Sequence, residues 1–413
     1  MNPRQLRVAV DETVARTKVL DVHTHLYDTN FDLLLWGVDE LVTYHYLIAE
    51  FFRCAPDVPY DAFWAMGKRE QADLVWERLF LQRSPISEST RGVLTTLQAL
   101  GIDVTGRDLA AARAYFGRAR LESHINKVFE LANLESVVMT NDPFDDSERA
   151  VWLRGLANRD ARFHAAMRID PLLNTGDTFV PQLAEQGYRV SRELDAVTCA
   201  SVCRFLDDWA DRMDPCYLAV SLPPTFRFPE DSIRGRMIQD CVLPFCRSRD
   251  LPFAMMIGVK KLTNPDLQLA GDSVGKARIE AVEYLCAHYP DNKFLVTMLS
   301  RENQHELCIA ARKFRNLMIF GCWWFMNNPS IIEEITRERV ELLGTSFIPQ
   351  HSDARVLDQL IYKWAHSRRI IADVLHDKYA AALEAGWPLT RDDIQRDVKA
   401  LFADNFKRFV GLC

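Results

Sequence analysis

The sequence predicts an α/β protein, and more specifically a (β/α)8 barrel with additional helices. Short apolar runs bounded by polar or turn residues recur along the chain, as expected for parallel strands buried on both faces. Between them lie amphipathic stretches of helical period, such as Gly275–His288 and Asn303–Lys313. Strand and helix in alternation, repeated eight times, is typical of a closed parallel barrel. The expected strands are Val19–His23, Leu134–Thr140, Phe163–Arg168, Tyr217–Ser221, Pro252–Ile257, Lys293–Met298, Leu317–Cys322 and Thr345–Gln350.

The gap after the first expected strand is too long for one helix. From residue 31 to residue 127 the pattern is helical and partly aromatic, as in Trp36–Arg53. We therefore expect a helical insertion, 31–127, packed over one end of the barrel. Ala354–Leu375 and Asp392–Val410 predict further helices after the last strand. Because the chain has no visible repeat, low-complexity tract or Gly/Ser-rich linker, residues 1–413 are expected to form one domain.

Composition argues against several classes of partner. The net charge of −7 leaves no basic excess to neutralise phosphates, so no nucleic-acid partner is expected. The ten cysteines include no C-x-x-C pair and are expected to be reduced core residues of a cytoplasmic protein. No apolar run reaches transmembrane length, and Met1–Gln5 is not followed by a signal-peptide pattern, so no membrane association is expected.

Two histidines at the end of the first expected strand predict a metal site. Strand side chains alternate between faces, so His23 and His25 point the same way. Because the first and eighth strands of a closed barrel are neighbours, Asp353 can join them at the catalytic end of the barrel. Three protein ligands with room for water or substrate indicate one catalytic divalent ion, with zinc expected first and manganese or iron also compatible. The alternative is a structural histidine pair, with Asp353 capping a helix that begins near Ala354.

Two arginines also fall at strand ends. Arg168 and Arg355 can each bind a planar carboxylate through two N–H groups, so a metal with these arginines indicates an anionic, oxygen-rich substrate such as a sugar acid. Alternatively, Arg168 only pairs with Asp170. Trp323 and Trp324 follow the seventh strand and favour core packing over a substrate platform.

Six segments, in matching order and approximate spacing, resemble motifs of the uronate (glucuronate) isomerases of the amidohydrolase superfamily. The resemblance extends over most of the chain, and the Trp-Trp-Phe segment is its most specific local match. The six segments are Leu20–His25, His45-Tyr46, Thr140–Pro143, Arg168–Asp170, Trp323–Phe325 and Ser352–Arg355.

The resemblance implies a metal-dependent aldose–ketose isomerase. It would convert D-glucuronate to D-fructuronate, or D-galacturonate to D-tagaturonate, through a cis-enediol, and would form a homo-oligomer. His45 and Tyr46, otherwise readable as ordinary buried residues, then lie on a helix that reaches into the pocket and can shuttle a proton. The implied catalytic residues are Asp353, Arg355, Arg168, Tyr46 and His45; the implied substrate-binding residues are Arg168, Arg355, Trp323 and Trp324; and the implied metal ligands are His23, His25 and Asp353.

One position departs from the family pattern. Where the family's fifth-strand motif has a histidine followed by Ile-Gly and later an arginine, this chain has Met256 and Lys261. Methionine cannot replace imidazole as a hydrogen-bond donor or as a ligand for a hard metal. Two alternatives therefore stay open. One is a hydrolase of the same superfamily, which the methionines at the fifth and sixth strand ends disfavour; the other is a barrel that binds a sugar acid without turnover.

Overall fold

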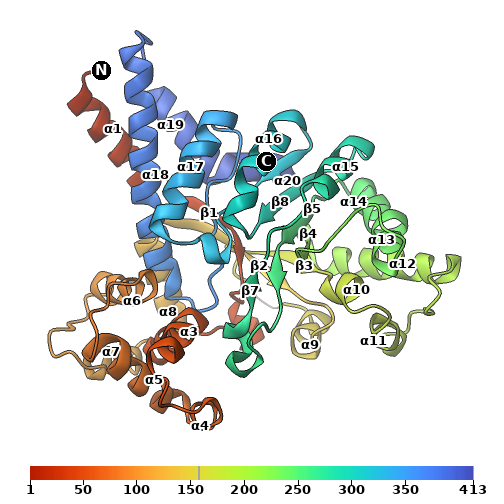
Figure 1. Ribbon diagram of the computed structural model, residues 1–413, viewed down its shortest axis with the longest axis horizontal. Coiled ribbons are helices and arrows are strands. Elements are labelled where there is room, and N and C mark those ends of the chain that lie inside the picture. The colour runs from red at the N-terminus through yellow and green to blue at the C-terminus, as the bar shows by residue number, and fades with distance from the viewer. Residues whose placement is uncertain (157–158, 413) are drawn as a thin grey trace.

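Seven parallel strands form the central sheet in the computed structural model, which describes residues 1–156 and 159–412 (Figure 1). Their order is β1-β2-β3-β4-β5-β8-β9, so each strand pairs with the next one along the chain, apart from a short hairpin formed by β6 and β7. Seven of the eight expected strands are thereby confirmed. The bounds are β1 Val19–Thr24, β2 Leu134–Asn141, β3 Phe163–Arg168, β4 Pro215–Leu222, β5 Phe253–Ile257, β6 Val259–Lys260, β7 Ser273–Val274, β8 Phe294–Met298 and β9 Leu317–Ile319.

The strands are apolar because both faces of the sheet are covered. In β2 the run Val137–Met139 is fully buried, and Ala165–Met167 of β3 and Leu218–Val220 of β4 are equally buried. In a parallel sheet with helices outside, a strand reads as a continuous apolar run rather than as an alternation. The outer layer consists of the helices that connect the strands.

The helices follow the predicted alternation. Many begin at a side-chain cap, as where Asp195 accepts from the Thr198 amide at the start of α12. No helix in the described part of the chain is long and apolar enough to cross a membrane. Before β2 they are α1 Pro3–Arg16, α2 Val38–Val42, α3 His45–Cys54, α4 Tyr60–Trp64, α5 Lys68–Trp76, α6 Glu88–Ala99, α7 Ala110–Phe116 and α8 Leu121–Leu131. After β2 they are α9 Asp146–Arg154, α10 Asp170–Asn174, α11 Phe179–Glu185, α12 Ala196–Met213, α13 Ile233–Met237, α14 Leu243–Ser248, α15 Glu280–His288, α16 Gln304–Lys313, α17 Pro329–Leu343, α18 Gln359–Glu384, α19 Arg391–Lys399 and α20 Asn405–Val410. Short 3-10 or π turns are η1 Thr29–Phe31, η2 Glu77–Leu81, η3 Ile238–Val242, η4 Pro265–Gly271, η5 Arg301–Asn303, η6 Trp324–Met326 and η7 Ala400–Asp404.

The structure shows seven strands of the predicted barrel and, at Thr345–Gln350, no eighth strand. This segment makes only an isolated bridge, between Ile348 and Phe320 beside β9. Pro349 has no N–H to donate to a ladder, and Asp353 adopts a left-handed φ of 52°, which ends the extended conformation. The chain nevertheless reaches β1, where the Asp353 amide donates to the His23 carbonyl at 3.1 Å. The segment therefore joins the two edges of a curled sheet without completing its ladder.

The helix after this segment also begins later than expected. We predicted a start near Ala354, but α18 begins at Gln359, after an isolated bridge at Val356 and a turn at 357–358. Val356 bridges Leu35, and the Gln359 Oε1 atom accepts from the Arg355 and Val356 amides at 2.9 and 3.1 Å. Asp353 thus does not cap a helix.

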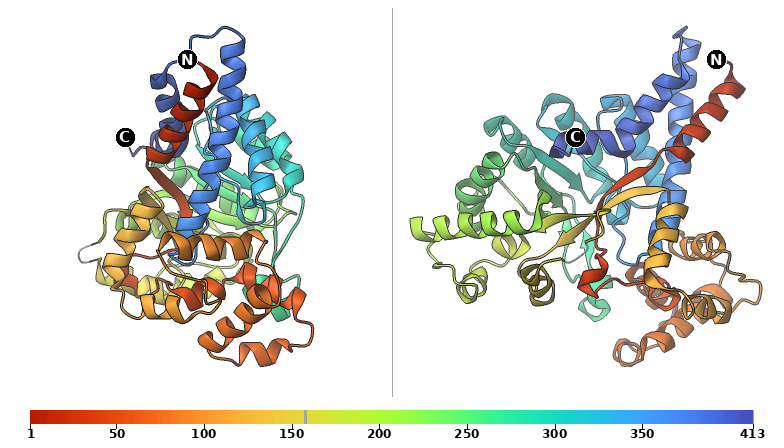
Figure 2. Two further views of the ribbon diagram at one scale, coloured as in Figure 1. Left: turned by 90° about the vertical axis from the view of Figure 1, so that its left-hand side faces the viewer. Right: turned by 180° about the vertical axis from the view of Figure 1, so that it is seen from behind.

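The segment between β1 and β2 is helical from α2 to α8. Figure 2 shows these helices, in orange, gathered at one end of the molecule, whereas α1 and α18 lie against each other and extend from the other end. The β6–β7 hairpin reaches towards α4, where the Trp64 indole N–H donates to the Asp266 carbonyl at 2.8 Å. The helices α2 to α8 and the β6–β7 hairpin lie near the carboxyl ends of the strands, where the candidate site lies.

Candidate active site

The first two site residues stand on β1 and directly after it. His23 is 1% exposed, and the side chain of His25 is 15% exposed, with the two ring centroids 5.4 Å apart. Burial lowers the pKa of His23 to about 3 and that of His25 to about 4. Both imidazoles are therefore neutral near pH 7, which is the state that can bind a metal ion.

Asp353 meets both imidazoles at the junction of the sheet edges. Its Oδ1 atom lies 3.5 Å from His23 Nε2 and 3.2 Å from His25 Nε2. Burial opposes ionisation of Asp353, but the adjacent histidines and Arg355 outweigh it and hold the pKa of this carboxyl well below its usual range. Within the described part of the chain, these three residues form the one group of three or more metal-ligating side chains whose ligand atoms all lie within 4.8 Å of one another.

The donor atoms of this group fit a divalent cation. Within the described residues, His23 Nε2 and Asp353 Oδ1 are buried without a hydrogen-bond partner. Atoms that carry only lone pairs repel one another unless a proton or a cation lies between them. Tetrahedral zinc with bonds of about 2.0–2.1 Å places its ligand atoms about 3.3–3.4 Å apart. The distances of 3.5 and 3.2 Å match that spacing.

Two buried ionisable residues hold the peptide that precedes Asp353. The Ser352 amide donates to Asp21 Oδ1 at 3.0 Å, and Lys363 Nζ donates to the Ser352 carbonyl at 2.5 Å. Asp21 is itself fixed by the Trp364 indole N–H at 2.8 Å. A left-handed φ is strained for a residue with a side chain, so Asp353 keeps it only where its neighbours are held on both sides.

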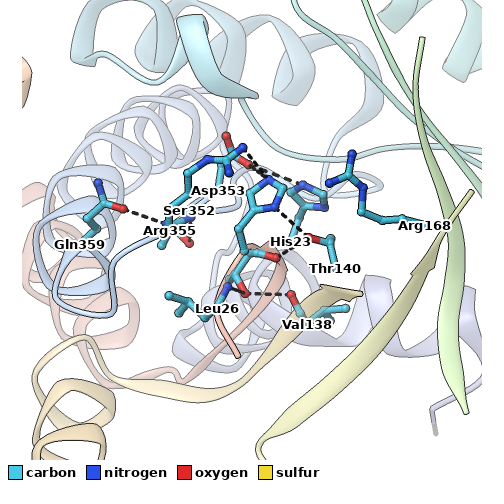
Figure 3. A network of polar contacts seen from close by, with 12 residues as sticks. His23, Leu26, Val138, Thr140, Arg168, Ser352, Asp353, Arg355 and Gln359 are labelled. Atoms are coloured by element: carbon cyan, nitrogen blue, oxygen red, sulfur yellow. Dashed lines mark hydrogen bonds and ion pairs between the residues drawn. The ribbon is translucent and has the colours of Figure 1, made fainter. Parts of the chain in front are cut away.

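The two predicted arginines lie on opposite sides of this group (Figure 3). Arg355 Nη2 is 3.5 Å from His25 Nε2, and its Nε is buried without a partner among the described residues. Arg168 forms an ion pair with Asp170 at 3.2 Å. Burial alone would lower the pKa of Arg168, but the negative charge of Asp170 outweighs it and raises that pKa. The pairing that we considered as an alternative thus exists, and it leaves the guanidinium beside the site.

The amino end of α3, together with Trp324, adds several polar groups. Among the residues described, the His45 Nδ1, Tyr46 hydroxyl, Tyr44 hydroxyl and Trp324 Nε1 atoms are buried and lack a hydrogen-bond partner. The His45 and Trp324 ring centroids are 5.7 Å apart. Burial lowers the pKa of His45 well below the usual value of a histidine. It raises the pKa of Tyr46 well above the usual value of a tyrosine. Both groups are therefore neutral near pH 7 and free to contact a ligand.

The structure brings most of the predicted residues together. His23, His25 and Asp353 form one group, Arg355 lies beside His25, and the His45 ring packs against Trp324. Trp323 is 4% exposed and belongs to the same apolar cluster as Met256, which is 2% exposed. Where the family pattern has a histidine, this chain thus has a packed core residue.

Several residues near the site escaped sequence reasoning. The sequence indicates Tyr217 and Thr140 only weakly, as polar residues within otherwise apolar strands. Lys363 lies in α18. The one indication in the sequence that it has a special role is its positive charge among residues that form the buried part of this helix. Asp21 and Tyr44 adjoin predicted site residues and could have been included for that reason.

Comparison with known proteins identifies the family. No protein-family model matches the chain, and no curated protein matches it either. Among solved structures, a uronate isomerase from Bacillus halodurans C-125 is 59% identical, with a TM-score of 0.98 over 100% of this chain and 97% of that chain. The chain belongs to the uronate isomerase family.

More distant members of the uronate isomerase family share the fold. A uronate isomerase from Thermotoga maritima is 15% identical with a TM-score of 0.80, over 98% of this chain and 97% of that chain. A glucuronate isomerase from Caulobacter crescentus is 15% identical with a TM-score of 0.78, over 99% of this chain and 94% of that chain. At such identities the likeness concerns the fold alone. The family resemblance expected from the six motifs is confirmed by the first comparison.

Proposed function

We propose that the protein is a hexuronate isomerase, which converts D-glucuronate to D-fructuronate or D-galacturonate to D-tagaturonate. The observation that carries this proposal is the 59% identity, over the whole chain, to a uronate isomerase. The site supports it, because two arginines lie beside the imidazole–carboxylate group at the strand ends. An anionic, hydroxyl-rich sugar acid matches both features.

The arginines hold the substrate. Arg355 and Arg168 lie on either side of the donor group, so one can bind the sugar carboxylate while the other binds the oxygens that become negative in the enediolate. Arg168 keeps its orientation through Asp170. The Trp324 indole N–H, which has no partner within the described residues, is a further donor for a sugar hydroxyl.

Isomerisation requires a proton to leave carbon 2 and a proton to reach carbon 1, while one hydroxyl proton moves from oxygen 2 to oxygen 1. The Tyr46 phenol remains protonated because burial raises its pKa, so it can donate to the carbonyl oxygen. The carbon-bound proton can be received by the Asp353 carboxylate or by His45, both of which are unprotonated near pH 7. The Trp324 and His45 rings are buried and contact each other, which limits the access of water to the enediol.

A divalent ion fits the three donors, and we propose zinc held by His23, His25 and Asp353. Two imidazoles and one carboxylate are a ligand set typical of catalytic zinc, with manganese and iron as alternatives. When bound, the ion supplies positive charge for the oxygens of the sugar. Metal content measured on purified protein, together with activity after chelation and reloading with each ion, tests this assignment.

The function is tested with a panel of hexuronates in deuterated water. The expected result is formation of the ketose, with incorporation of solvent deuterium at carbon 2 of recovered aldose. His45→Gln separates the two bases: exchange at carbon 2 that persists in this variant excludes His45, and exchange that is lost while zinc is retained excludes Asp353 as the sole base. Absence of ketose and of exchange for every hexuronate would refute the proposal. Hydrolysis of a lactone or amide would then indicate the hydrolase, and binding without turnover the sugar-acid-binding protein.

We also propose the finer architecture expected from the sequence. Residues 345–350 take the eighth position of a (β/α)8 barrel, supported by the hydrogen bonds that this segment makes with β9 and that Asp353 makes with β1. Residues 1–413 then form one domain, with 31–127 as a helical insertion. The homo-oligomer implied by the family stays a prediction, which sedimentation velocity can test.

A further inference from the structure

Two hydroxyl groups contact the imidazoles on the side away from Asp353. The Tyr217 hydroxyl lies 3.1 Å from His23 Nδ1. Thr140, which Figure 3 shows beside the imidazoles, has its Oγ1 3.0 Å from His25 Nδ1. Thr140 belongs to β2, the neighbour of β1. Tyr217 belongs to β4, which is separated from β1 by two strands in the sheet order, so its phenol spans the interior of the curled sheet.

Each hydroxyl also contacts a backbone carbonyl of β1. The Tyr217 hydroxyl is 2.8 Å from the Val22 carbonyl oxygen, and Thr140 Oγ1 is 2.9 Å from the Thr24 carbonyl oxygen. In both cases this carbonyl belongs to the residue directly before the histidine. The same arrangement thus occurs twice, with one hydroxyl bridging the imidazole of a histidine and the carbonyl that precedes it.

These distances determine where the hydrogens lie. A hydroxyl has one hydrogen, and a carbonyl oxygen has none to offer. If the hydroxyl donated to the imidazole, two buried oxygens would face each other at 2.8 or 2.9 Å with no hydrogen between them, which is repulsive. The hydroxyl hydrogen therefore points at the carbonyl, and the hydroxyl oxygen accepts a hydrogen from Nδ1.

The opposite side of His25 gives independent support. Arg355 Nη2, which can only donate, lies 3.5 Å from His25 Nε2. A lone pair on Nε2 faces this positive charge, so Arg355 favours the Nδ1–H form, as Thr140 does from the other side. Asp353 Oδ1, at 3.2 Å from the same nitrogen, is the one neighbour that would accept a hydrogen there, and it competes with these two groups until an ion lies between the donors.

We propose that Tyr217 and Thr140 are positioning residues that hold His23 and His25 in the Nδ1–H tautomer. Both Nε2 lone pairs then face Asp353 Oδ1 before any ion binds. This inference rests on the part of the proposed function that makes these three residues metal ligands. It does not depend on which sugar is converted.

The consequence is a gain in metal affinity. An imidazole with a free Nδ1 can place its hydrogen on Nε2 and must change tautomer before it binds an ion. Loss of a hydrogen-bond partner of a ligating histidine typically lowers metal affinity about 10- to 100-fold. We expect a loss in this range from Tyr217→Phe and from Thr140→Val, each of which removes one hydroxyl and keeps the approximate shape.

The test reads the tautomers directly. Metal-free protein labelled with ¹⁵N-histidine is studied by long-range ¹H–¹⁵N correlation near pH 7.5, and the two signals are assigned by their loss in His23→Gln and His25→Gln. The wild-type protein is expected to show Nδ1–H at both rings. Tyr217→Phe should change the pattern of His23 alone, and Thr140→Val that of His25 alone. Zinc affinity is measured on the same samples by competition with a chelator.

Matched controls separate a positioning role from general packing. Thr297→Val removes a buried hydroxyl on β8 that has no hydrogen-bond partner in the described part of the chain, and Tyr379→Phe removes a hydroxyl that bonds Asp397. Both should keep wild-type tautomers and wild-type zinc affinity. An Nε2–H form at either ring of the wild-type protein would overturn the inference, even if a variant fails to fold. So would variants that bind zinc within twofold of wild type. A protein with the expected tautomers and zinc affinity but without isomerase activity would instead refute the proposed function alone.

Discussion

Lys363→Met should separate the stability of the protein from its affinity for a metal ion. Lys363 is 4% exposed, and its ammonium group donates to the Ser352 carbonyl, one residue before Asp353. Methionine has a similar length and no charge, so it can fill the same space in the interior.

Two opposing contributions decide the effect on stability. Burial lowers the pKa of Lys363 from 10.5 to about 8, although Asp353 and Asp21 act in the opposite direction. At 1.36 kcal/mol per pKa unit, keeping this ammonium charged costs about 3 kcal/mol. Its hydrogen bond to a carbonyl contributes about 1.5–3 kcal/mol. The two nearly cancel, so the free energy of unfolding of the variant should lie within about 2 kcal/mol of wild type.

The effect on metal affinity, unlike the effect on stability, has a definite direction. Without Lys363 the Ser352 carbonyl is free to turn, and Asp353 can leave its φ of 52°. Relief of such strain is worth about 1–2 kcal/mol. Restoring the strained conformation on metal binding would then lower zinc affinity about 10-fold. The value of kcat/KM at limiting zinc should fall by a similar factor.

The assay compares metal-free proteins by thermal unfolding and by chelator competition for zinc. With about 2.1 cal/mol/K of unfolding entropy per residue, the whole chain shifts its Tm by about 1 °C per kcal/mol. The control is Lys378→Met, on the same helix, which removes only an exposed ion pair with Glu341. A Lys363→Met protein with wild-type zinc affinity would refute the reasoning, and so would a Tm lowered by more than about 4 °C.

Three further predictions concern pH, metal and substrate. Burial raises the pKa of Asp142 from 3.8 to about 6, so the folded protein keeps a proton there that the unfolded chain releases. Stability should therefore fall by up to about 3 kcal/mol as pH rises from 4 to 6. Asp142→Asn should remove this loss; a Tm difference from wild type that is constant with pH would contradict it. Zinc at about 1000 times its Kd should raise the Tm by about 5 °C through binding to the folded state. The His23→Ala/Asp353→Asn double variant should show no such rise, and a rise there would place the ion elsewhere. Arg355→Lys keeps the charge but loses the two-pronged donor, so KM for hexuronate should rise about 10-fold or more. An unchanged KM would exclude a carboxylate contact.

The sequence was sufficient for the repeating parts of the fold. Buried parallel strands are continuous apolar runs, so β2, β3 and β5 could be predicted within one or two residues of their ends. The eighth segment is less apolar, with Phe347 and Ile348 in its centre, and it forms only an isolated bridge because Pro349 has no N–H to extend the pairing. An apolar pattern does not report how far such pairing extends, so the sequence could not predict that the ladder stops there.

The residues of the candidate site likewise fall into those that the sequence predicts and those that it does not. His23 and His25 could be predicted because strand alternation places them on one face, and Asp353 because it follows the last strand. The supporting residues could not be found in this manner. Tyr217 reaches β1 from β4, and Lys363 reaches the Ser352 carbonyl from α18. Such contacts depend on how distant elements pack, and no local sequence pattern encodes them.

The join at Asp353, where the Asp353 amide and the Ala354 carbonyl form hydrogen bonds with His23 and His25, determines when the site can form during synthesis. Arg355 and His25, which flank this join, are 330 positions apart in the sequence. At about 5–20 residues per second, β1 leaves the ribosome roughly 15 to 65 s before its partner. During that time one edge of β1 lacks the hydrogen bonds that Asp353 and His25 later make across the join. An open strand edge invites pairing with other chains. A nascent chain therefore carries two converging imidazoles on an unprotected edge, and only the segment that contains Asp353 both covers that edge and completes the donor set.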